Sequence, residues 1–265
     1  MSTVGLFVHP GRPAAIALAA TVRAWLEARG HQVEDGPQPS PAIDLVVAIG
    51  GDGTVLRSAR VAVESDADVL GINLGELGYL AEVEPDAWEA ALTAYFAGDH
   101  RIQERMLVTS SIGGGAPLHP ALNEVVIEKQ AIGRTVRLAV WIDGAYFTSY
   151  VADGVIVSTP TGSTAYSLSA RGPIVDPSHR ALILTPVSPH SLFDRSLVLG
   201  PDSVVEIEVT GDRDAAISID GQQAGTVRVG QRVRVASSPE PARIAHLGGR
   251  TFHQVLKAKF GLSDR

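Results

Sequence analysis

A short glycine-rich loop, Gly50-Gly51-Asp52-Gly53-Thr54, constrains this chain more than any other stretch. Before it, residues 43–49 form an almost continuous apolar run rich in β-branched side chains, which is typical of a buried parallel strand. After it, residues 54–62 have the pattern of the first turns of a helix. The sequence therefore predicts a strand, a glycine loop and a helix N-terminus, in that order.

The loop has the composition of an anion-binding site. Glycines leave room for phosphate oxygens near the backbone, and a helix N-terminus offers unpaired N–H groups and the positive end of its dipole. We expect Gly50, Gly51, Gly53 and Thr54 to bind nucleotide phosphates. Asp52 would repel a bare phosphate, so its position indicates a residue that holds a metal or takes a proton from an attacking hydroxyl. The alternative is a tight turn in which Asp52 only caps the helix.

Composition excludes several classes of protein. The chain has 265 residues, 45% of them hydrophobic and 19% charged, which fits one large or two ordinary globular domains. Its net charge is −7 without a basic stripe, so we expect no nucleic-acid partner. The absence of cysteine excludes disulfides and fits a cytoplasmic location. The apolar run at 14–20 is too short to cross a membrane, so we expect no membrane association.

Strands and helices alternate in the first hundred residues, which predicts parallel βαβ units. From residue 101 the pattern changes to strands with little helix, and Asp143-Gly144 is a hairpin-turn signal. We therefore expect an α/β domain over 1–100, a β-rich domain over 101–249 and a tail over 250–265 whose helix packs back on the first domain. The expected strands are 4–8, 43–49, 69–73, 101–112, 123–129, 134–142, 146–151, 182–185, 204–209, 216–219 and 231–236, and the expected helices are 13–29, 54–62, 86–97 and 251–260.

Two further stretches have residues suited to binding. Asn123 and Glu124 directly precede an apolar strand, although such a pair is also common at an ordinary turn. The stretch 153–169 begins with an acid and a glycine, continues as a buried strand, and ends in a dense run of hydroxyl residues near a helix start at Thr164. Hydroxyls can cap a helix or hold ribose and phosphate oxygens, and we expect capping to account for only one or two of them. Tyr166 could stack on a base.

These motifs together resemble the series found in bacterial NAD kinases. The glycine loop alone is also similar to that of diacylglycerol kinases and phosphofructokinases, whereas the stretch 153–169 is the most specific part. The motifs occur in the family's order over roughly residues 45–225. They are Gly50-Gly51-Asp52-Gly53-Thr54, Asn73-Leu74-Gly75, Leu77-Gly78-Tyr79-Leu80, Asn123-Glu124, Asp153 through Ser169, Pro189-His190-Ser191-Leu192 and Asp220-Gly221-Gln222.

The resemblance implies a fold and a reaction. The fold is a Rossmann-like α/β domain with a parallel sheet, followed by an all-β, sandwich-like domain that binds NAD, with the active site between them. The reaction is transfer of the γ-phosphoryl group of ATP to the adenosine 2′-hydroxyl of NAD, giving NADP and ADP. A divalent cation, Mg²⁺, arrives with the ATP rather than in a protein metal site. A homo-oligomer, either a dimer or a tetramer, is also implied.

The resemblance further implies roles for individual residues. Asp52 matches the catalytic base. Residues that match NAD contacts are Asp52, Gly53, Arg57, Asn123, Glu124, Arg134, Asp153, Thr164, Ala165, Tyr166, Ser167, Leu168, Ser169 and Gln222.

Two positions depart from the family pattern: Arg171 stands where many relatives have glycine, and Val151 where some have a polar or basic residue.

Two other functions share the glycine loop. A lipid kinase of the same superfamily would not need the stretch 153–169, and the chain has no apolar, lipid-sized segment facing a membrane. A non-catalytic nucleotide-sensing module would keep the glycines but would have no need of Asp52.

Overall fold

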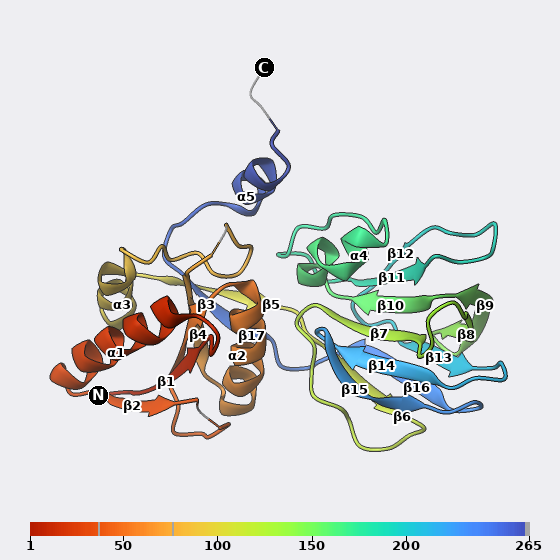
Figure 1. Ribbon diagram of the computed structural model, residues 1–265, viewed down its shortest axis with the longest axis horizontal. Helices are drawn as coiled ribbons and strands as arrows, with labels where there is room; N and C mark the ends of the chain where they lie inside the picture. The colour runs from red at the N-terminus through yellow and green to blue at the C-terminus, as the bar shows by residue number, and fades with distance from the viewer. Residues whose placement is uncertain (37, 76, 263–265) are drawn as a thin grey trace. The chain divides into compact units, whose positions relative to one another are not determined.

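The computed structural model describes residues 1–36, 38–75 and 77–262, and it divides into two compact units (Figure 1). The first unit comprises Met1–Glu104 and Ala242–Arg265, and the second comprises Arg105–Pro241. The last three residues of the predicted tail, 263–265, lie outside the described part. No helix within the described residues is long and apolar enough to span a bilayer.

The first unit is built on a six-stranded sheet. The paired strands β2-β1, β1-β3, β3-β4 and β4-β17 are all parallel, as the alternation of strands and helices predicts. The order across the sheet is β2-β1-β3-β4-β17-β5. The strands are β1 (Thr3–Val8), β2 (Gln32–Asp35), β3 (Leu45–Gly50), β4 (Asp68–Asn73), β5 (Arg101–Arg105) and β17 (Ala242–His246).

Helices cover both faces of this sheet because its central strands β3 and β4 are buried on both sides. Helices α1 (Pro13–Ala28) and α3 (Trp88–Phe96) pack into one core cluster with alternate residues of β3 and β4, such as Ile49 and Ile72. Helix α2 (Asp52–Ser65) contacts the same strands from the other face, where Val55 lies against Gly71. Three of the predicted helices are thus confirmed, with shifts of one to a few residues at their ends.

The tail forms helix α5 (Phe252–Lys259), which begins at a capping box between Thr251 and Gln254. The Phe252 and Tyr79 rings lie 5.9 Å apart, and the Lys259 ammonium lies 4.8 Å from the centre of the Tyr79 ring. The helix therefore contacts the first unit, as expected. Its apolar face is only partly covered, because Val255 is buried whereas Phe260 is half exposed.

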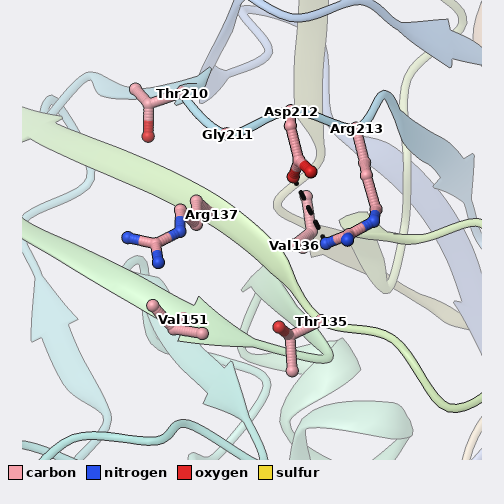
Figure 2. A pocket seen from close by; sticks show the side chains of 8 residues that line it. All are labelled: Thr135, Val136, Arg137, Val151, Thr210, Gly211, Asp212 and Arg213. Atoms are coloured by element: carbon pink, nitrogen blue, oxygen red, sulfur yellow. Dashed lines mark ion pairs between the residues drawn. The ribbon is translucent and has the colours of Figure 1, made fainter.

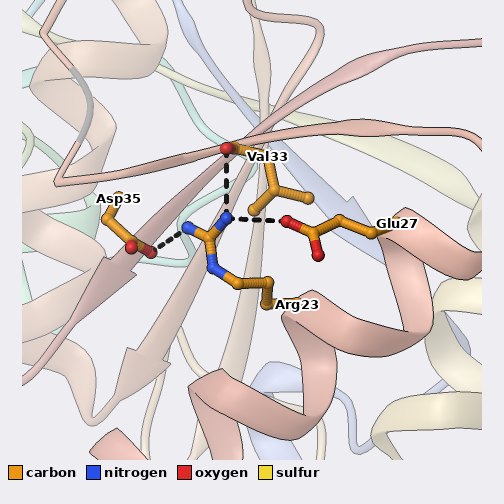
Figure 3. A network of polar contacts seen from close by, with 4 residues as sticks. All are labelled: Arg23, Glu27, Val33 and Asp35. Carbon is orange, nitrogen blue, oxygen red and sulfur yellow. Dashed lines mark hydrogen bonds and ion pairs between the residues drawn. The ribbon is translucent and has the colours of Figure 1, made fainter.

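The edge strand β2 is absent from the sequence prediction because its side chains are mostly polar and exposed. Arg23 of α1 attaches this strand to the helix (Figure 3). Its guanidinium donates to the Val33 carbonyl at 3.3 Å and pairs with Asp35 at 2.5 Å and with Glu27 at 2.9 Å. An interaction between a helix and an edge strand thus fixes an element that has no apolar periodicity of its own.

The predicted strand at 101–112 is wrong as a single element. Residues 101–105 form β5 of the first sheet, whereas β6 (Val108–Ile112) belongs to the second unit. The predicted domain boundaries also differ from the two units, since residues 242–249 return to the first unit. There β17 pairs with β4, and the Arg243 guanidinium lies 2.9 Å from the Asp68 carboxylate. Sequence periodicity predicted a strand at 101–112 but not which sheet each part joins, and it predicted no strand at β17.

The second unit consists of two antiparallel sheets that share one hydrophobic core, which confirms the expected β-rich, sandwich-like domain. The strand orders are β12-β11-β10-β7-β14-β15 and β6-β16-β13-β8-β9. The remaining strands are β7 (Glu124–Lys129), β8 (Val136–Ile142), β9 (Ala145–Ala152), β10 (Gly154–Ser158), β11 (Leu182–Val187), β12 (Leu197–Leu199), β13 (Val205–Val209), β14 (Ala215–Ile219), β15 (Gln222–Val227) and β16 (Arg232–Ser237).

Two local predictions for this unit have different outcomes. Asp143 and Gly144 both have positive φ, at 52° and 79°, which confirms the hairpin turn between β8 and β9. The helix expected near Thr164 is only a 3₁₀ turn, η1 (Thr161–Thr164), followed by the single turn α4 (Tyr166–Ser169). Arg171 then follows with φ +68°, so the chain leaves α4 through a left-handed residue.

Candidate functional site

The glycine loop lies where β3 passes into α2, at the carboxyl edge of the first sheet. Gly51 caps the helix, and the Leu74 amide that follows β4 donates to the Gly50 carbonyl at 2.6 Å. In open sheets of this kind, ligands bind in the crevice outside the carboxyl ends of the strands. The loop and the chain after β4 therefore meet at the edge where a ligand is expected.

The three glycines of the loop have different reasons to be glycine. A Cβ on Gly50 would overlap the Thr54 hydroxyl, so packing alone requires glycine there. A Cβ on Gly51 or Gly53 would meet nothing within 4 Å. Open space thus adjoins the last two, where phosphate oxygens could approach the backbone.

The Asp52 carboxylate accepts hydrogen bonds from three consecutive backbone amides. Tyr79 donates to Oδ2 at 2.8 Å, whereas Leu80 and Ala81 donate to Oδ1 at 2.9 and 3.2 Å. A carboxylate offers about four lone-pair positions, so one position on Oδ2 remains for a ligand. A Cβ on Gly78 would overlap this carboxylate, which explains the glycine in the motif before Tyr79.

Two arginines lie on the elements around the loop. Arg57 is exposed on α2 one turn after Gly53, so the two residues lie on the same side of the helix. Arg12 was not predicted from the sequence; its guanidinium donates to the Leu74 carbonyl at 2.8 Å and lies beside Gly75. The sequence offered no signal for Arg12, because its contact with residue 74 joins segments far apart along the chain. Among the described residues, no three His, Asp or Glu side chains gather as metal ligands.

A second aspartate organises one edge of the β-rich unit, where β7 begins and β10 and β14 end. The Asp220 carboxylate accepts from the amides of Leu122 and Asn123 at 2.8 Å each and of Glu124 at 3.1 Å. Asp220 and Gly221 form the turn into β15 with φ of 49° and 74°. No role was predicted for Asp220 from the sequence, although Asp-Gly is a hairpin-turn signal.

Glu124 lies beside Asp220 at this edge of the β-rich unit, and its pKa is strongly raised. Its side chain is buried and accepts from the Tyr166 amide, and its Oε2 has no hydrogen-bond partner among the described residues. Burial raises the pKa of Glu124 to about 8, and the nearby Asp220 charge adds to the increase. At pH 7 the carboxyl group is therefore mostly protonated and can both donate and accept a hydrogen bond.

The hydroxyl-rich stretch is largely occupied with contacts inside the protein. Thr159 Oγ1 donates to the Leu122 carbonyl at 2.6 Å, Thr164 Oγ1 donates to the Thr161 carbonyl at 3.2 Å, and Ser167 Oγ lies 3.1 Å from Thr185 Oγ1. Ser163 Oγ bonds both the carbonyl and the amide of Val175. Several of these hydroxyls are thus used by long-range contacts inside the protein rather than by helix capping.

The other predicted residues of this stretch are closer to solvent. Tyr166 and Ser169 are exposed, and Thr164, Ala165 and Leu168 are partly buried. Burial raises the pKa of the Tyr166 phenol, and the charges of Glu128 and Asp153 add to the increase. A Cβ on Gly162 would overlap the Asn123 carbonyl, so this turn packs directly on the chain before Glu124.

Asp153 does not lie with Glu124. Ser158 pairs with Glu124 at one end of β10, whereas Asp153 precedes the other end, roughly 17 Å away at about 3.3 Å per residue. There Asp153 pairs with the Lys129 ammonium at 2.5 Å. Gln222 is exposed at the start of β15, near Asp220, and Arg134 is exposed in the loop before β8.

Comparison with known proteins gives a consistent result. Two family models match the chain: the ATP-NAD kinase N-terminal domain over residues 38–100 and the ATP-NAD kinase C-terminal domain over residues 122–247. An NAD kinase of Heliobacterium modesticaldum is 40% identical over 98% of both chains. One of Moorella thermoacetica is 37% identical over 98% of this chain and 89% of its own.

Solved structures agree. The crystal structure of an NAD kinase from Archaeoglobus fulgidus in complex with ATP is 25% identical, covers 98% of both chains and has a TM-score of 0.78. The crystal structure of yeast NADH kinase complexed with NADH is 22% identical and covers 100% of this chain and 89% of its own. Its TM-score of 0.89 shows the same fold.

Proposed function

The chain belongs to the NAD kinase family, and we propose that it phosphorylates the adenosine 2′-hydroxyl of NAD from ATP with Asp52 as the general base. As the hydroxyl oxygen bonds to the γ-phosphorus, its proton passes to Asp52 Oδ2 and ADP leaves, giving NADP. The observation that carries this role is the lone-pair position left on Oδ2 after three amides have bonded the carboxylate.

The ATP phosphates are proposed to lie against the glycine loop. The open space beside Gly51 and Gly53 and the N-terminus of α2 support this placement. Gly50 and Thr54 would fix the conformation of the loop, since the Thr54 side chain leaves no room for a Cβ at Gly50. A Mg²⁺ ion bound to ATP would neutralise phosphate charge, and the free position on Asp52 Oδ2 stays available for the proton of the attacking hydroxyl.

NAD is proposed to contact the β-rich unit through Asn123 and Glu124. The buried, unpartnered Glu124 Oε2 supports this proposal, because such a group needs a polar partner and a ribose hydroxyl would provide one. An Asp153 contact would involve a different part of the dinucleotide, since Asp153 lies at the far end of β10. The other proposed NAD-contacting residues are Gly53, Arg57, Arg134, Thr164, Ala165, Tyr166, Ser167, Leu168, Ser169 and Gln222. Assembly as a dimer or tetramer and a cytoplasmic location stay predictions.

One assay tests the proposed reaction against its alternatives. Purified full-length protein with ATP and Mg²⁺ would receive NAD, NADH and diacylglycerol in parallel, with products identified by mass. We expect NADP from NAD and no phosphorylated lipid. Folded protein that binds NAD but forms no NADP would instead indicate a nucleotide-sensing module.

A further inference from the structure

A polar pocket in the β-rich unit contains none of the residues proposed for NAD phosphorylation. Its volume is about 530 Å³, within the range of small-molecule sites. Figure 2 shows the residues that line it: Thr135, Val136, Arg137, Val151, Thr210, Gly211, Asp212 and Arg213. They come from the start of β8, the end of β9 and the loop after β13.

Thr210, Arg137 and Val151 lie side by side, in the loop after β13 and on strands β8 and β9. The Thr210 amide donates to the Arg137 carbonyl at 3.0 Å, and Arg137 is paired in register with Val151. Val136 and Leu138, on either side of Arg137, are buried in the core. Because strand side chains alternate, Arg137 must point outward into the pocket.

The Arg137 side chain is oriented by packing. A Cβ on Gly211 would lie 3.3 Å from the Arg137 Cβ and 3.5 Å from its Cγ and Cδ, so the aliphatic stem follows the glycine backbone. In Figure 2 the guanidinium lies between Thr210 and Val151. It has no hydrogen bond or ion pair within the described part of the chain. A held stem with an unpaired cationic head is suited to an anion.

The opposite wall adds a second guanidinium. Arg213 pairs with Asp212 at 3.3 Å, but that carboxylate is 77% exposed and leaves the two arginines with a net positive charge. Hydroxyl groups of Thr135 and Thr210 complete the polar lining. We propose that this pocket binds a small phosphate-bearing anion, with Arg137 as its principal cation, since a guanidinium matches phosphate oxygens in bidentate fashion.

The anion could be free phosphate or the phosphate of a nucleotide, and two probes separate these sources. Inorganic pyrophosphate and AMP would each be titrated calorimetrically into full-length protein already saturated with NAD and a non-hydrolysable ATP analogue. Binding of pyrophosphate alone identifies a free phosphate ligand, whereas binding of AMP identifies a nucleotide. Either result supports the proposed site if binding of the probe depends on Arg137.

The variants test that dependence. We expect Arg137→Gln to weaken binding at least tenfold. The matched control Arg234→Gln should leave it unchanged, because Arg234 is an exposed arginine of the same sheet outside the pocket. Gly211→Ala, which displaces the Arg137 stem but keeps its charge, should also weaken binding, with circular dichroism confirming the fold.

Three results of the binding experiments would overturn the proposal. They are no binding of either probe to the wild-type protein, equal affinity in Arg137→Gln, and equal losses in Arg137→Gln and Arg234→Gln. A fall in NAD phosphorylation by Arg137→Gln without any probe would also overturn it, because the pocket would then belong to the substrate site. That last result leaves the proposed kinase reaction intact.

Discussion

Asp52 and Asp220 lie in different units and hold the backbone in the same way. Each carboxylate accepts from three consecutive amides, those of residues 79–81 for Asp52 and those of residues 122–124 for Asp220. Their surroundings differ. Asp52 begins a helix beside the open glycine loop, whereas Asp220 is partly buried in a hairpin turn near Glu124. In the proposed function, the same arrangement of hydrogen bonds serves catalysis at Asp52 and positions the proposed NAD contacts Asn123 and Glu124 at Asp220.

Asp52→Asn should have the largest effect on turnover. Because general-base catalysis contributes about 10²–10⁴-fold, we expect kcat to fall by that factor at saturating substrates. The Kd for NAD, measured with and without Mg²⁺, should change little. A variant that keeps more than about a tenth of the wild-type kcat would contradict the role.

The Asp52→Asn variant also tests the three hydrogen bonds that the Asp52 carboxylate accepts from backbone amides. An asparagine amide would place an NH₂ group against one of the three backbone donors, which costs about 1–3 kcal/mol of stability. Urea unfolding measures this cost separately from kcat. Gly53→Ala is a control for crowding at the loop, because a Cβ there meets no protein atom and any loss must come from the ligand.

Asp220→Asn should instead raise the KM for NAD. Loss of charge-assisted bonds to the Asn123 and Glu124 amides costs on the order of 1.5–3 kcal/mol, so we expect KM to rise about 10–100-fold with a smaller change in kcat. Asp143→Asn is the matched control, since Asp143 also occupies an Asp-Gly turn and accepts from the Val204 amide at 2.8 Å. Equal KM changes in the two variants would refute a positioning role for Asp220.

The pH dependence of stability should report Glu124. Because burial raises the pKa of Glu124 to about 8, the unfolded chain loses this proton at lower pH than the folded protein does. The free energy of unfolding should therefore fall as pH rises from about 4.5 to about 8, by a few kcal/mol at most, on the order of 1.4 kcal/mol per pH unit.

Glu124→Gln should reduce this slope to the part that Asp220 contributes, because burial raises the pKa of Asp220 as well. The stability of the variant relative to wild type should increase toward pH 8. Glu128→Gln, on the same strand, should retain the slope. Chemical unfolding at several pH values makes the comparison, and an unchanged slope in Glu124→Gln would show that another group causes it.

Arg171→Gly should have the smallest effect on stability and turnover. It changes the backbone at a position that bonds neither Asp52 nor Asp220. Arg171 is exposed and has φ +68°, which costs a residue with a Cβ about 1 kcal/mol relative to glycine. We expect a stability gain of about that size and unchanged KM values for ATP and NAD. A tenfold rise in either KM would show that the cation reaches a nucleotide.

Much of the fold could be predicted because its strands are apolar and its turns carry glycine. Strands β1, β3 and β4 and the Asp143-Gly144 hairpin follow from local pattern. Strand β2 could not be predicted because it lacks apolar periodicity, and the assignment of β5 and β17 to the first sheet depends on pairing between distant segments.

The sequence by itself determined the glycine loop, its acid and the residue types of the binding stretches. Only the tertiary structure decided that Gly50 is required by packing, that Asp52 keeps one free lone-pair position, and that Asp153 lies far from Glu124. It also gave Asp220 its role, through bonds to residues 96–98 positions away. Periodicity reflects which face of an element is buried, whereas the direction of a polar side chain depends on backbone groups that only the folded chain brings beside it.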